Sequence, residues 1–305
     1  MLDGQDLQPV EASIRDSVSA LPAADPTIVS VSDIHGFIRE GRSSLLTLRD
    51  HPDYEPIVET GQLRTLNWVG GEEYVLVLNG DLIDRGAHSE KVVEMAERLA
   101  EQAPPGHVRV TFGNHEMGVL TPDFFDWGDW YSTTRTDEQR RAFSRAIEDG
   151  HVVAAYEGYN VTYAHAGRPE PYEAAELNDE LLAGARYLAE GIGGADDHRR
   201  QEQLVLDYPA VYGVDGETGR GAGAGVAWLD FEFMPDDAPP QVVGHTRQDS
   251  PIRRGNVICE NVIRNNRRNE GGEAVIVETP DRIVALGRDG DDTVREHEFS
   301  LPTAE

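Results

Sequence analysis

Five short polar blocks, each containing glycine, recur along this chain in an order that restricts what it can fold into. The blocks are DIHG (33–36), GDLIDRG (80–86), GNHE (113–116), HAG (165–167) and GHT (244–246). Four of them directly follow apolar, β-branched runs that are typical of buried strands. In open α/β sheets, functional side chains gather just beyond the carboxyl ends of the strands. The pattern therefore predicts an α/β fold with one site built from several strand ends.

The apolar runs between these blocks give the expected elements. Strands are predicted over residues 27–31, 74–78, 107–112, 152–156, 161–164, 241–243, 257–258, 274–277 and 282–286. Helices are predicted through 43–48, over 89–102 and within 171–207. The strand–helix–strand alternation at the start of the chain favours a largely parallel sheet there.

The length of 305 residues suits one large domain or two small ones. We expect an acidic N-terminal tail or loosely packed helix over 1–25 and one domain over 26–298. The aromatic residues at 124–131 make a cap insertion over 120–150 one interpretation, although such clusters more often lie in a core. The segment 51–72 is rich in proline and glycine, and the glycine-rich run at 216–225 predicts a flexible loop.

Charge excludes some classes of partner. The chain has 27 Lys and Arg residues against 56 Asp and Glu residues, a formal net charge of −29, and Lys91 is its only lysine. Nucleic-acid backbones and anionic membranes are bound by basic surfaces, so neither is expected as a partner. Acid excess with lysine scarcity favours adaptation to high salt, and the alternative is an ordinary acidic protein. Salt adaptation predicts a melting temperature that rises with KCl concentration.

The location is expected to be cytoplasmic. Cys259 is the only cysteine, which excludes an intramolecular disulfide, and it lies in an apolar run. The first residues lack the basic start and apolar core of a secretory signal, and no apolar run is long enough to span a bilayer. Cys259 is expected to be a buried small side chain rather than a nucleophile.

The blocks together supply a ligand set for two adjacent metal ions. The expected ligands are Asp33, His35, Asp81, Asn114, His165 and His245. Cations such as Mn²⁺, Fe²⁺/³⁺ and Zn²⁺ accept mixed oxygen and imidazole ligands, and one carboxylate at a strand end can bridge two of them. Any one block alone is weak, but five in order are hard to obtain by accident. Two metals about 3.5–4 Å apart can activate a hydroxide at neutral pH.

The GDLIDRG block carries a resemblance to a known family. With its aspartate and arginine three and four places after Asp81, it resembles the phosphoprotein phosphatases of the calcineurin-like metallophosphoesterase superfamily. That family includes Ser/Thr protein phosphatases and symmetrical diadenosine tetraphosphatases. The resemblance covers about residues 27–287. It implies a four-layer α/β fold in which helices flank two mixed β-sheets, with the site at the sheet edges.

The resemblance also implies roles for the block residues. Metal one would take Asp33, His35 and Asp81, and metal two would take Asp81, Asn114, His165 and His245. Mn²⁺ is the expected metal, with Fe or Zn as alternatives.

Catalytic roles follow from the same resemblance. His115 would protonate the leaving oxygen while Asp84 holds it, and Arg85 would clamp the phosphate. The nucleophile would be a metal-bridging hydroxide, so no phosphoenzyme is expected.

A second phosphate-binding arginine has no clear equivalent. Arg220, Arg168 and Arg247 are candidates, and each could equally be a surface arginine. Arg267 and Arg268 lie in a basic segment inside an acidic chain, where related phosphatases carry a loop above the site. They are predicted to form an electrostatic funnel for an anionic substrate, and the alternative is a surface hairpin paired with nearby carboxylates.

Three functions remain open at this point. The leading hypothesis is a phosphomonoesterase that acts on protein Ser/Thr phosphate. A nucleotide or dinucleoside polyphosphate hydrolase would use the same site chemistry. A non-catalytic metal-binding module is disfavoured because the ligands, His115 and Asp84 are all present. A partner is therefore expected among phosphorylated proteins or nucleotides.

Overall fold

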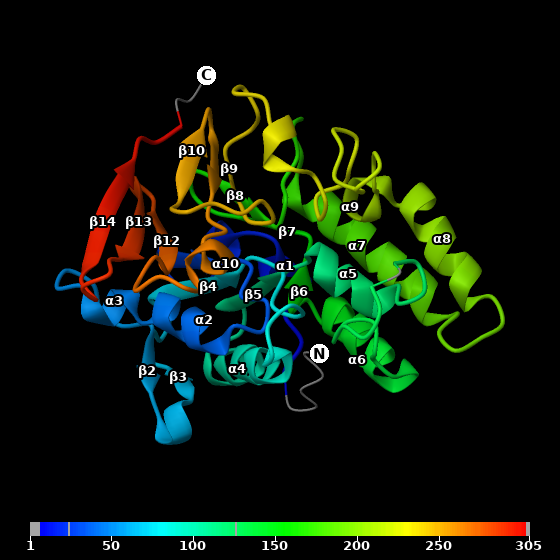
Figure 1. Ribbon diagram of the computed structural model, residues 1–305, viewed down its shortest axis with the longest axis horizontal. Coiled ribbons are helices and arrows are strands. Elements are labelled where there is room, and N and C mark those ends of the chain that lie inside the picture. The colour runs from blue at the N-terminus through cyan, green and yellow to red at the C-terminus, as the bar shows by residue number, and fades with distance from the viewer. Residues whose placement is uncertain (1–6, 24, 126, 303–305) are drawn as a thin grey trace.

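The computed structural model describes residues 7–23, 25–125 and 127–302 and has two mixed sheets (Figure 1). The seven-stranded sheet has the order β14 (Val294–Phe299), β13 (Arg282–Arg288), β12 (Ala274–Thr279), β1 (Thr27–Val31), β4 (Tyr74–Leu78), β5 (Val108–Thr111) and β6 (Val152–Val153). The five-stranded sheet has the order β10 (Ile252–Arg254), β11 (Val257–Cys259), β9 (Gln241–Val243), β8 (Thr162–Ala164) and β7 (Ala155–Glu157).

Strand direction brings the carboxyl ends of several strands to one side. β1, β4, β5 and β6 are mutually parallel, and so are β8, β9 and β11. β12 pairs with β1 in antiparallel fashion, with Val29 opposite Val277, and starts the antiparallel half of the larger sheet. A separate hairpin of β2 (Val58–Thr60) and β3 (Leu66–Trp68) projects away from both sheets (Figure 1).

The two sheets pack face to face. Alternate residues of one strand point to opposite faces, so Ile28 lies between the sheets while Val29 and Val31 join the core on the helix side. The core between the sheets also contains Val75 from the larger sheet and Tyr163 from the smaller one. Because both faces of the central strands are covered, β1, β4 and β5 are buried along almost their whole length rather than at alternate residues.

Helices cover the outer faces. The helices are α1 (Ala12–Arg15), α2 (Ile38–Leu45), α3 (Thr47–Asp50), α4 (Ser89–Gln102), α5 (Asn114–Leu120), α6 (Asp137–Glu148), α7 (Ala174–Ala189), α8 (Asp197–Asp207), α9 (Pro209–Tyr212) and α10 (Ile263–Asn266). α2, α3 and α4 contact the larger sheet, and α7 contacts β7 of the smaller one. The predicted fold class, two mixed sheets flanked by helices, is confirmed. No helix in the described ranges is both long and apolar enough to cross a bilayer.

The strand predicted over 152–156 is wrong as a single element. Val152 and Val153 pair with β5 of the larger sheet, whereas residues 155–157 pair with β8 of the smaller one. The chain crosses between the sheets at Ala154, where the Asn178 side chain accepts hydrogen bonds from the N–H groups of Ala154 and Ala155. A continuous apolar run does not reveal such a crossing, because both parts are buried.

Three further segments differ from expectation. The helix expected through 43–48 begins earlier, at Ile38, and is interrupted at Leu46. The segment 51–72 contains the β2–β3 hairpin, and β14 was not predicted because only its end residues, Val294 and Phe299, are buried. In the N-terminal stretch, residues 1–6 lie outside the described residues, while Val18 and Leu21 are buried in the core between the sheets.

Candidate active site

The five polar blocks meet at the carboxyl ends of the parallel strands. Asp33 and His35 follow β1, Asp81 follows β4, and Asn114 is the first residue of α5 after β5. From the other sheet, His165 follows β8 and His245 follows β9. Neighbouring parallel strands end at the same edge, so residues far apart in sequence become neighbours there.

Asp81 lies at the centre of this group. Its Oδ2 is 3.4 Å from His35 Nε2, and its Oδ1 is 3.4 Å from His165 Nε2. Asp33 Oδ1 is 3.6 Å from His35 Nε2. One carboxylate therefore faces an imidazole on each side, which is the arrangement that a ligand shared by two cations requires.

Asn114 and His245 complete the second half. Asn114 Oδ1 is 3.3 Å from His165 Nε2 and 3.0 Å from His245 Nδ1, and the two imidazole nitrogens are 3.2 Å apart. The side-chain atoms of Asp81, His165 and His245 lie close enough to hold one cation, and so do those of Asp81, His35 and His115. The structure thus brings together all six predicted ligands. It also places His115 within reach of the same cation as Asp81 and His35.

The donor atoms suit divalent metals. His35 Nδ1 lies 2.9 Å from the Ile83 carbonyl oxygen, and His165 Nδ1 lies 3.1 Å from the Asn79 carbonyl oxygen. These carbonyls fix the Nδ1–H tautomer and leave each Nε2 lone pair facing the centre. Asp33 Oδ1 and His245 Nε2 are buried without a hydrogen-bond partner. Orphaned buried polar atoms are costly, and a bound cation would satisfy the Asp33 oxygen, whereas His245 faces Asn114 and His165 through its other nitrogen, Nδ1.

The electrostatics of the site favour positive charge between the carboxylates. Burial lowers the pKa of His35 and of His245 well below the usual range, which keeps both imidazoles neutral as ligands must be. Burial also lowers the pKa of His165, but the adjacent Asp81 outweighs it and raises that pKa to about 9. Burial raises the pKa of Asp33 to about 6. A proton on His165 or a bound metal ion would each compensate the negative charge of the buried Asp33 and Asp81 carboxylates.

The backbone around the ligands is strained. Asp33, His35, Asp81 and His245 have φ values of 52°, 48°, 54° and 59°. This left-handed region costs roughly 1–2 kcal/mol for a residue with a side chain. Such strain gathers at functional sites, where the surrounding structure holds it in place.

Glycines allow the ligands to approach one another closely. Gly80 has a φ of 77°, and a Cβ added there would lie 2.5 Å from His165 Nδ1. A Cβ at Gly244 would lie 2.3 Å from Asp33 Oδ2. At these two positions a side chain would displace a predicted metal ligand, which explains why the blocks pair ligands with glycine.

Glu116 supports the site and was not predicted. Its carboxylate accepts hydrogen bonds from the backbone N–H groups of Asp81 (2.7 Å), Leu82 (3.0 Å) and Gly113 (3.1 Å). Burial raises the pKa of Glu116 to about 8. Its place three residues after Gly113, at the start of α5, is a sequence signal for a helix-capping carboxylate that could have identified it.

His115 and Asp84 form a buried pair beside the ligands. His115 Nδ1 is 2.6 Å from Asp84 Oδ2, and Asp84 also accepts hydrogen bonds from the Ser132 N–H (2.9 Å) and hydroxyl (2.7 Å). The opposite ring nitrogen, His115 Nε2, lies 3.1 Å from Arg85 Nη2 and 3.9 Å from Asp81 Oδ2. The pair therefore presents Nε2 to the centre while Asp84 fixes the ring.

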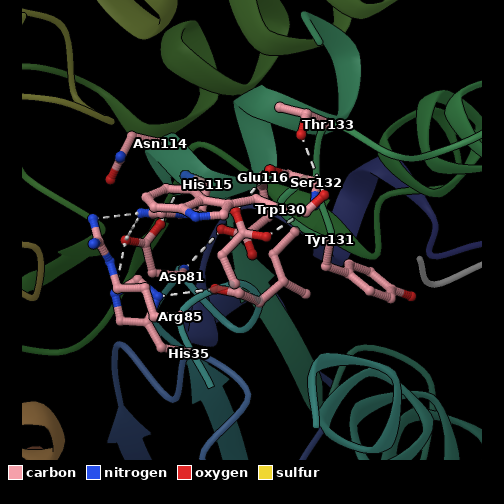
Figure 2. A network of polar contacts seen from close by, with 12 residues as sticks. His35, Asp81, Arg85, Asn114, His115, Glu116, Trp130, Tyr131, Ser132 and Thr133 are labelled. Atoms are coloured by element: carbon pink, nitrogen blue, oxygen red, sulfur yellow. Dashed lines mark hydrogen bonds and ion pairs between the residues drawn. The ribbon is translucent and has the colours of Figure 1, made fainter. Parts of the chain in front are cut away.

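Two indole rings cover the His115 imidazole. Trp127 and Trp130 each stack at 5.0 Å from the His115 ring, and the Arg85 guanidinium lies 4.8 Å from the Trp130 ring centre. Figure 2 shows Trp130 against His115 and Arg85. Trp127 also stacks on Phe125 at 4.4 Å. These aromatic residues lie in the segment 120–150, for which the sequence allows either a cap or a core role, and Trp127 and Trp130 contact the site directly.

The predicted arginines lie at different places around the site. Arg220 is paired with Asp230 at 2.9 Å and donates to Thr246, and Arg247 is exposed. Arg267 stacks on the Phe37 ring at 3.9 Å, and Arg268 is exposed. Arg168 is partly exposed, and its backbone N–H donates to Gln241.

Arg264 is a second residue that sequence reasoning missed. Its guanidinium is half-buried, and burial followed by repulsion from Arg85 and Arg247 lowers its pKa to about 10. Asp33 and Asp81 act on it in the opposite direction. Arg264 therefore lies within electrostatic reach of the metal-ligand carboxylates. Arg264 belongs to the same basic segment as Arg267 and Arg268, and nothing in the sequence of that segment distinguishes it from them.

Comparisons with known proteins agree with this geometry. Residues 26–222 match the family model for calcineurin-like phosphoesterases. A probable serine/threonine-protein phosphatase from Encephalitozoon cuniculi is 28% identical over 155 residues, which cover 46% of this chain and 34% of that protein. Shewanella-like protein phosphatase 2 from Arabidopsis thaliana is 28% identical over 119 residues, which cover 34% of this chain and 27% of that protein. The matches thus span about a third of these relatives' own length.

A solved structure supports the fold alone. The cold-active protein-tyrosine phosphatase of a psychrophilic Shewanella species has a TM-score of 0.57 at 17% identity, covering 95% of this chain and 85% of that one. The family match, which covers more than half of the chain, coincides with the blocks at 33–36, 80–86, 113–116 and 165–167. The chain belongs to the calcineurin-like phosphoesterase family.

Proposed function

We propose that this protein is a metal-dependent phosphoesterase that hydrolyses phosphomonoesters, with phosphorylated Ser or Thr of proteins as the main substrate. The observation that carries the proposal is the convergence of six ligand side chains on Asp81 with the His115–Asp84 pair beside them. A ligand set alone would suit a structural metal. An adjacent proton donor held by a carboxylate is what ester hydrolysis adds.

Asp33, His35, Asp81, Asn114, His165 and His245 would hold the metals. A bound pair of divalent ions would supply hydroxide at neutral pH and polarise the phosphoryl oxygens. The protein contributes the fixed orientation of these side chains through the carbonyls of Ile83 and Asn79. Mn²⁺ is proposed as the metal, with Fe or Zn as alternatives.

His115 would donate a proton from Nε2 to the leaving oxygen. Asp84 would stabilise the protonated imidazole, and Ser132 holds Asp84 in turn through two hydrogen bonds. Arg85 would bind the phosphate, since its guanidinium lies 3.1 Å from His115 Nε2. Phosphate held by Arg85 would thus lie beside the nitrogen that carries the proton. Arg264 is proposed as the second phosphate-binding arginine.

A protein substrate is favoured by the names of the relatives, which are protein phosphatases. Dinucleoside polyphosphate hydrolysis is a second candidate, since Arg85, Arg264 and Arg247 together could take more than one phosphate. The indole rings of Trp127 and Trp130 already contact His115, Phe125 or Arg85. They therefore leave little room for a nucleotide base to stack on them, which disfavours the dinucleotide substrate.

The proposal is tested by measuring phosphate release in the presence of Mn²⁺. The substrates, compared side by side, are a phosphothreonine peptide, a phosphotyrosine peptide and diadenosine tetraphosphate. Preference for the phosphothreonine peptide supports it. Preference for the dinucleotide moves the function to nucleotide hydrolysis, and turnover of none of them favours the non-catalytic module.

Salt adaptation and a cytoplasmic location stay proposals. The net charge of −29 supports the first, because screening at molar salt removes repulsion between surface carboxylates over a few ångströms. A melting temperature that does not rise between dilute buffer and molar KCl would remove it.

A further inference from the structure

A strongly cationic groove lies outside the active site, lined by residues of α2, α4 and the β2–β3 hairpin. It has a volume of about 740 Å³. Its charged lining residues are Arg39, Arg42, Arg64, Lys91 and Arg98, with Glu94 as the single carboxylate. Ile38, Leu63, Leu66 and Met95 add apolar surface.

The groove contrasts with the rest of the chain. The formal net charge is −29, yet five of the 27 Lys and Arg residues, including the only lysine, line this groove. In the part of the chain that the structure describes, none of the five forms an ion pair with a carboxylate, whereas Arg140, Arg200 and Arg282 elsewhere do. The pKa of Arg42 is lowered by burial and then by Arg64, so these two cations repel each other.

The groove continues toward the active site. A second cavity of about 450 Å³ shares Ile38 and Arg39 with the groove and is also lined by Arg267, Arg85 and one carboxylate, Glu40. Arg85 contacts His115 at 3.1 Å, so the cationic lining reaches the catalytic pair. Arg267, which stacks on Phe37, lines the same cavity as Arg39 and Arg85.

We propose that this cationic path binds an acidic stretch of the polypeptide substrate that flanks the phosphorylated residue. The inference rests on the proposed protein phosphatase function. It adds that the active site prefers substrates with acidic residues beside the phosphorylated residue. Carboxylates of the substrate would meet the five groove cations while the phosphorylated residue reaches Arg85. Local positive charge in an otherwise repulsive field would orient such a substrate as it approaches.

A peptide fits better than nucleic acid. The exposed carboxylates Glu59 and Glu90 are the direct sequence neighbours of the lining residues Thr60 and Lys91, so a long regular polyanion would extend beyond the five cations onto negative charge. The apolar side chains in the lining, with Leu63 99% exposed at the hairpin, offer contacts that a polypeptide with an apolar residue can use.

The test uses three phosphothreonine peptides and one small aryl phosphate. One peptide carries a run of Glu before the phosphothreonine, one carries it after, and the third has Gln in both flanks. The enzyme with Mn²⁺ is assayed at low ionic strength and again in molar KCl. We expect kcat/KM for one acidic peptide to exceed that for the Gln peptide by about tenfold, and the difference to shrink in salt.

The variant Arg64→Gln/Lys91→Gln removes two groove charges. It should abolish most of the preference and leave aryl phosphate turnover unchanged. Arg186→Gln/Arg199→Gln is the matched control, because it removes the same charge from exposed positions on α7 and α8 whose ion pairs contribute little. That control should keep the preference.

Equal kcat/KM for the three peptides, or equal loss in the groove and control variants, overturns the inference. Inhibition by an oligothymidylate that only the groove variant escapes, with no peptide preference, would assign the groove to nucleic acid and overturn it as well. Failure to hydrolyse any peptide while the aryl phosphate is turned over contradicts the proposed protein substrate instead, so the two failures can be told apart.

Discussion

The floor and the rim of the site are built in different ways. The floor residues Asp33, His35, Asp81 and His165 are at most 2% exposed, and they sit at strand ends that both sheets hold in place. The rim residues Arg85, Arg264 and Arg267 are half-buried or exposed. Arg85 and Arg267 contact aromatic rings rather than carboxylates. We therefore expect the chemistry to depend on the buried strand ends and the choice of substrate to depend on the more exposed cations around them.

The largest effect should come from His115→Asn, on the floor. Asn cannot donate the proton, so kcat should fall by about 10²–10⁴-fold, while the bound metal should be retained because the six ligands are intact. Phosphate release and metal analysis on the same sample measure both. Unchanged kcat would contradict the role of His115, and loss of metal would make it a ligand.

Gly80→Ala should show how closely the floor is packed. The added Cβ would meet His165 Nδ1 at 2.5 Å, so metal affinity should fall by roughly 10–100-fold as that imidazole is displaced. Gly71→Ala is the matched control, since Gly71 also has a positive φ of 55° but nothing lies within 4 Å of an added Cβ. Equal metal affinity in the two variants would show that the added Cβ at Gly80 does not displace His165.

Arg264→Gln tests the rim. We expect KM for a phosphopeptide to rise about tenfold with a smaller change in kcat, because a half-buried cation near Arg85 is lost. Arg268→Gln, at an exposed position of the same segment, should change KM less. Steady-state kinetics of both variants decide the point; a larger effect of Arg268 would restore the predicted funnel as the main substrate contact.

Glu278→Gln extends the comparison to a buried carboxylate outside the site. Glu278 accepts hydrogen bonds from Tyr163 Oη (2.9 Å) and from the Asn160 N–H (2.6 Å), and burial raises its pKa from 4.5 to about 7. Between these two pH values the folded chain keeps a proton that the unfolded chain releases. The stabilising effect of this proton is therefore complete below pH 4.5 and is lost as pH rises to about 7.

The Gln side chain does not titrate, so the variant should gain stability relative to the wild type over this pH range, by on the order of 3 kcal/mol at most. Denaturant unfolding at several pH values measures the difference, and kcat should not change. A difference in unfolding free energy that stays constant with pH would show that Glu278 is ionised in the folded protein.

The floor could be predicted from the sequence because its signals are local. A β-branched run followed by a ligand and a glycine fixes both the strand and the position of the ligand beyond it, as for Thr27–Val31 and Asp33. The blocks name the six proposed ligands, His115 and Asp84, which the structure brings together, and their roles stay predictions.

The rim and the crossing between sheets could not be predicted, because they depend on distant packing. Trp127 and Trp130 look like core residues in sequence, and only the fold shows that they cover His115. Arg264 lies within α10 and is partly buried, whereas Arg267 and Arg268 follow the helix and are exposed, a difference that depends on how α10 packs. The strand at 152–156 is divided by Asn178, which lies more than twenty residues further along the chain.

The most direct test of the account is to strip the protein of metal and follow phosphate release from a phosphothreonine peptide as Mn²⁺ is added back. A shared two-metal centre predicts no turnover without metal. It also predicts a rate that saturates near two equivalents of Mn²⁺ per chain, since Asp81 faces a ligand group on each side. Turnover by the stripped protein, or saturation at one equivalent, would contradict a shared two-metal centre.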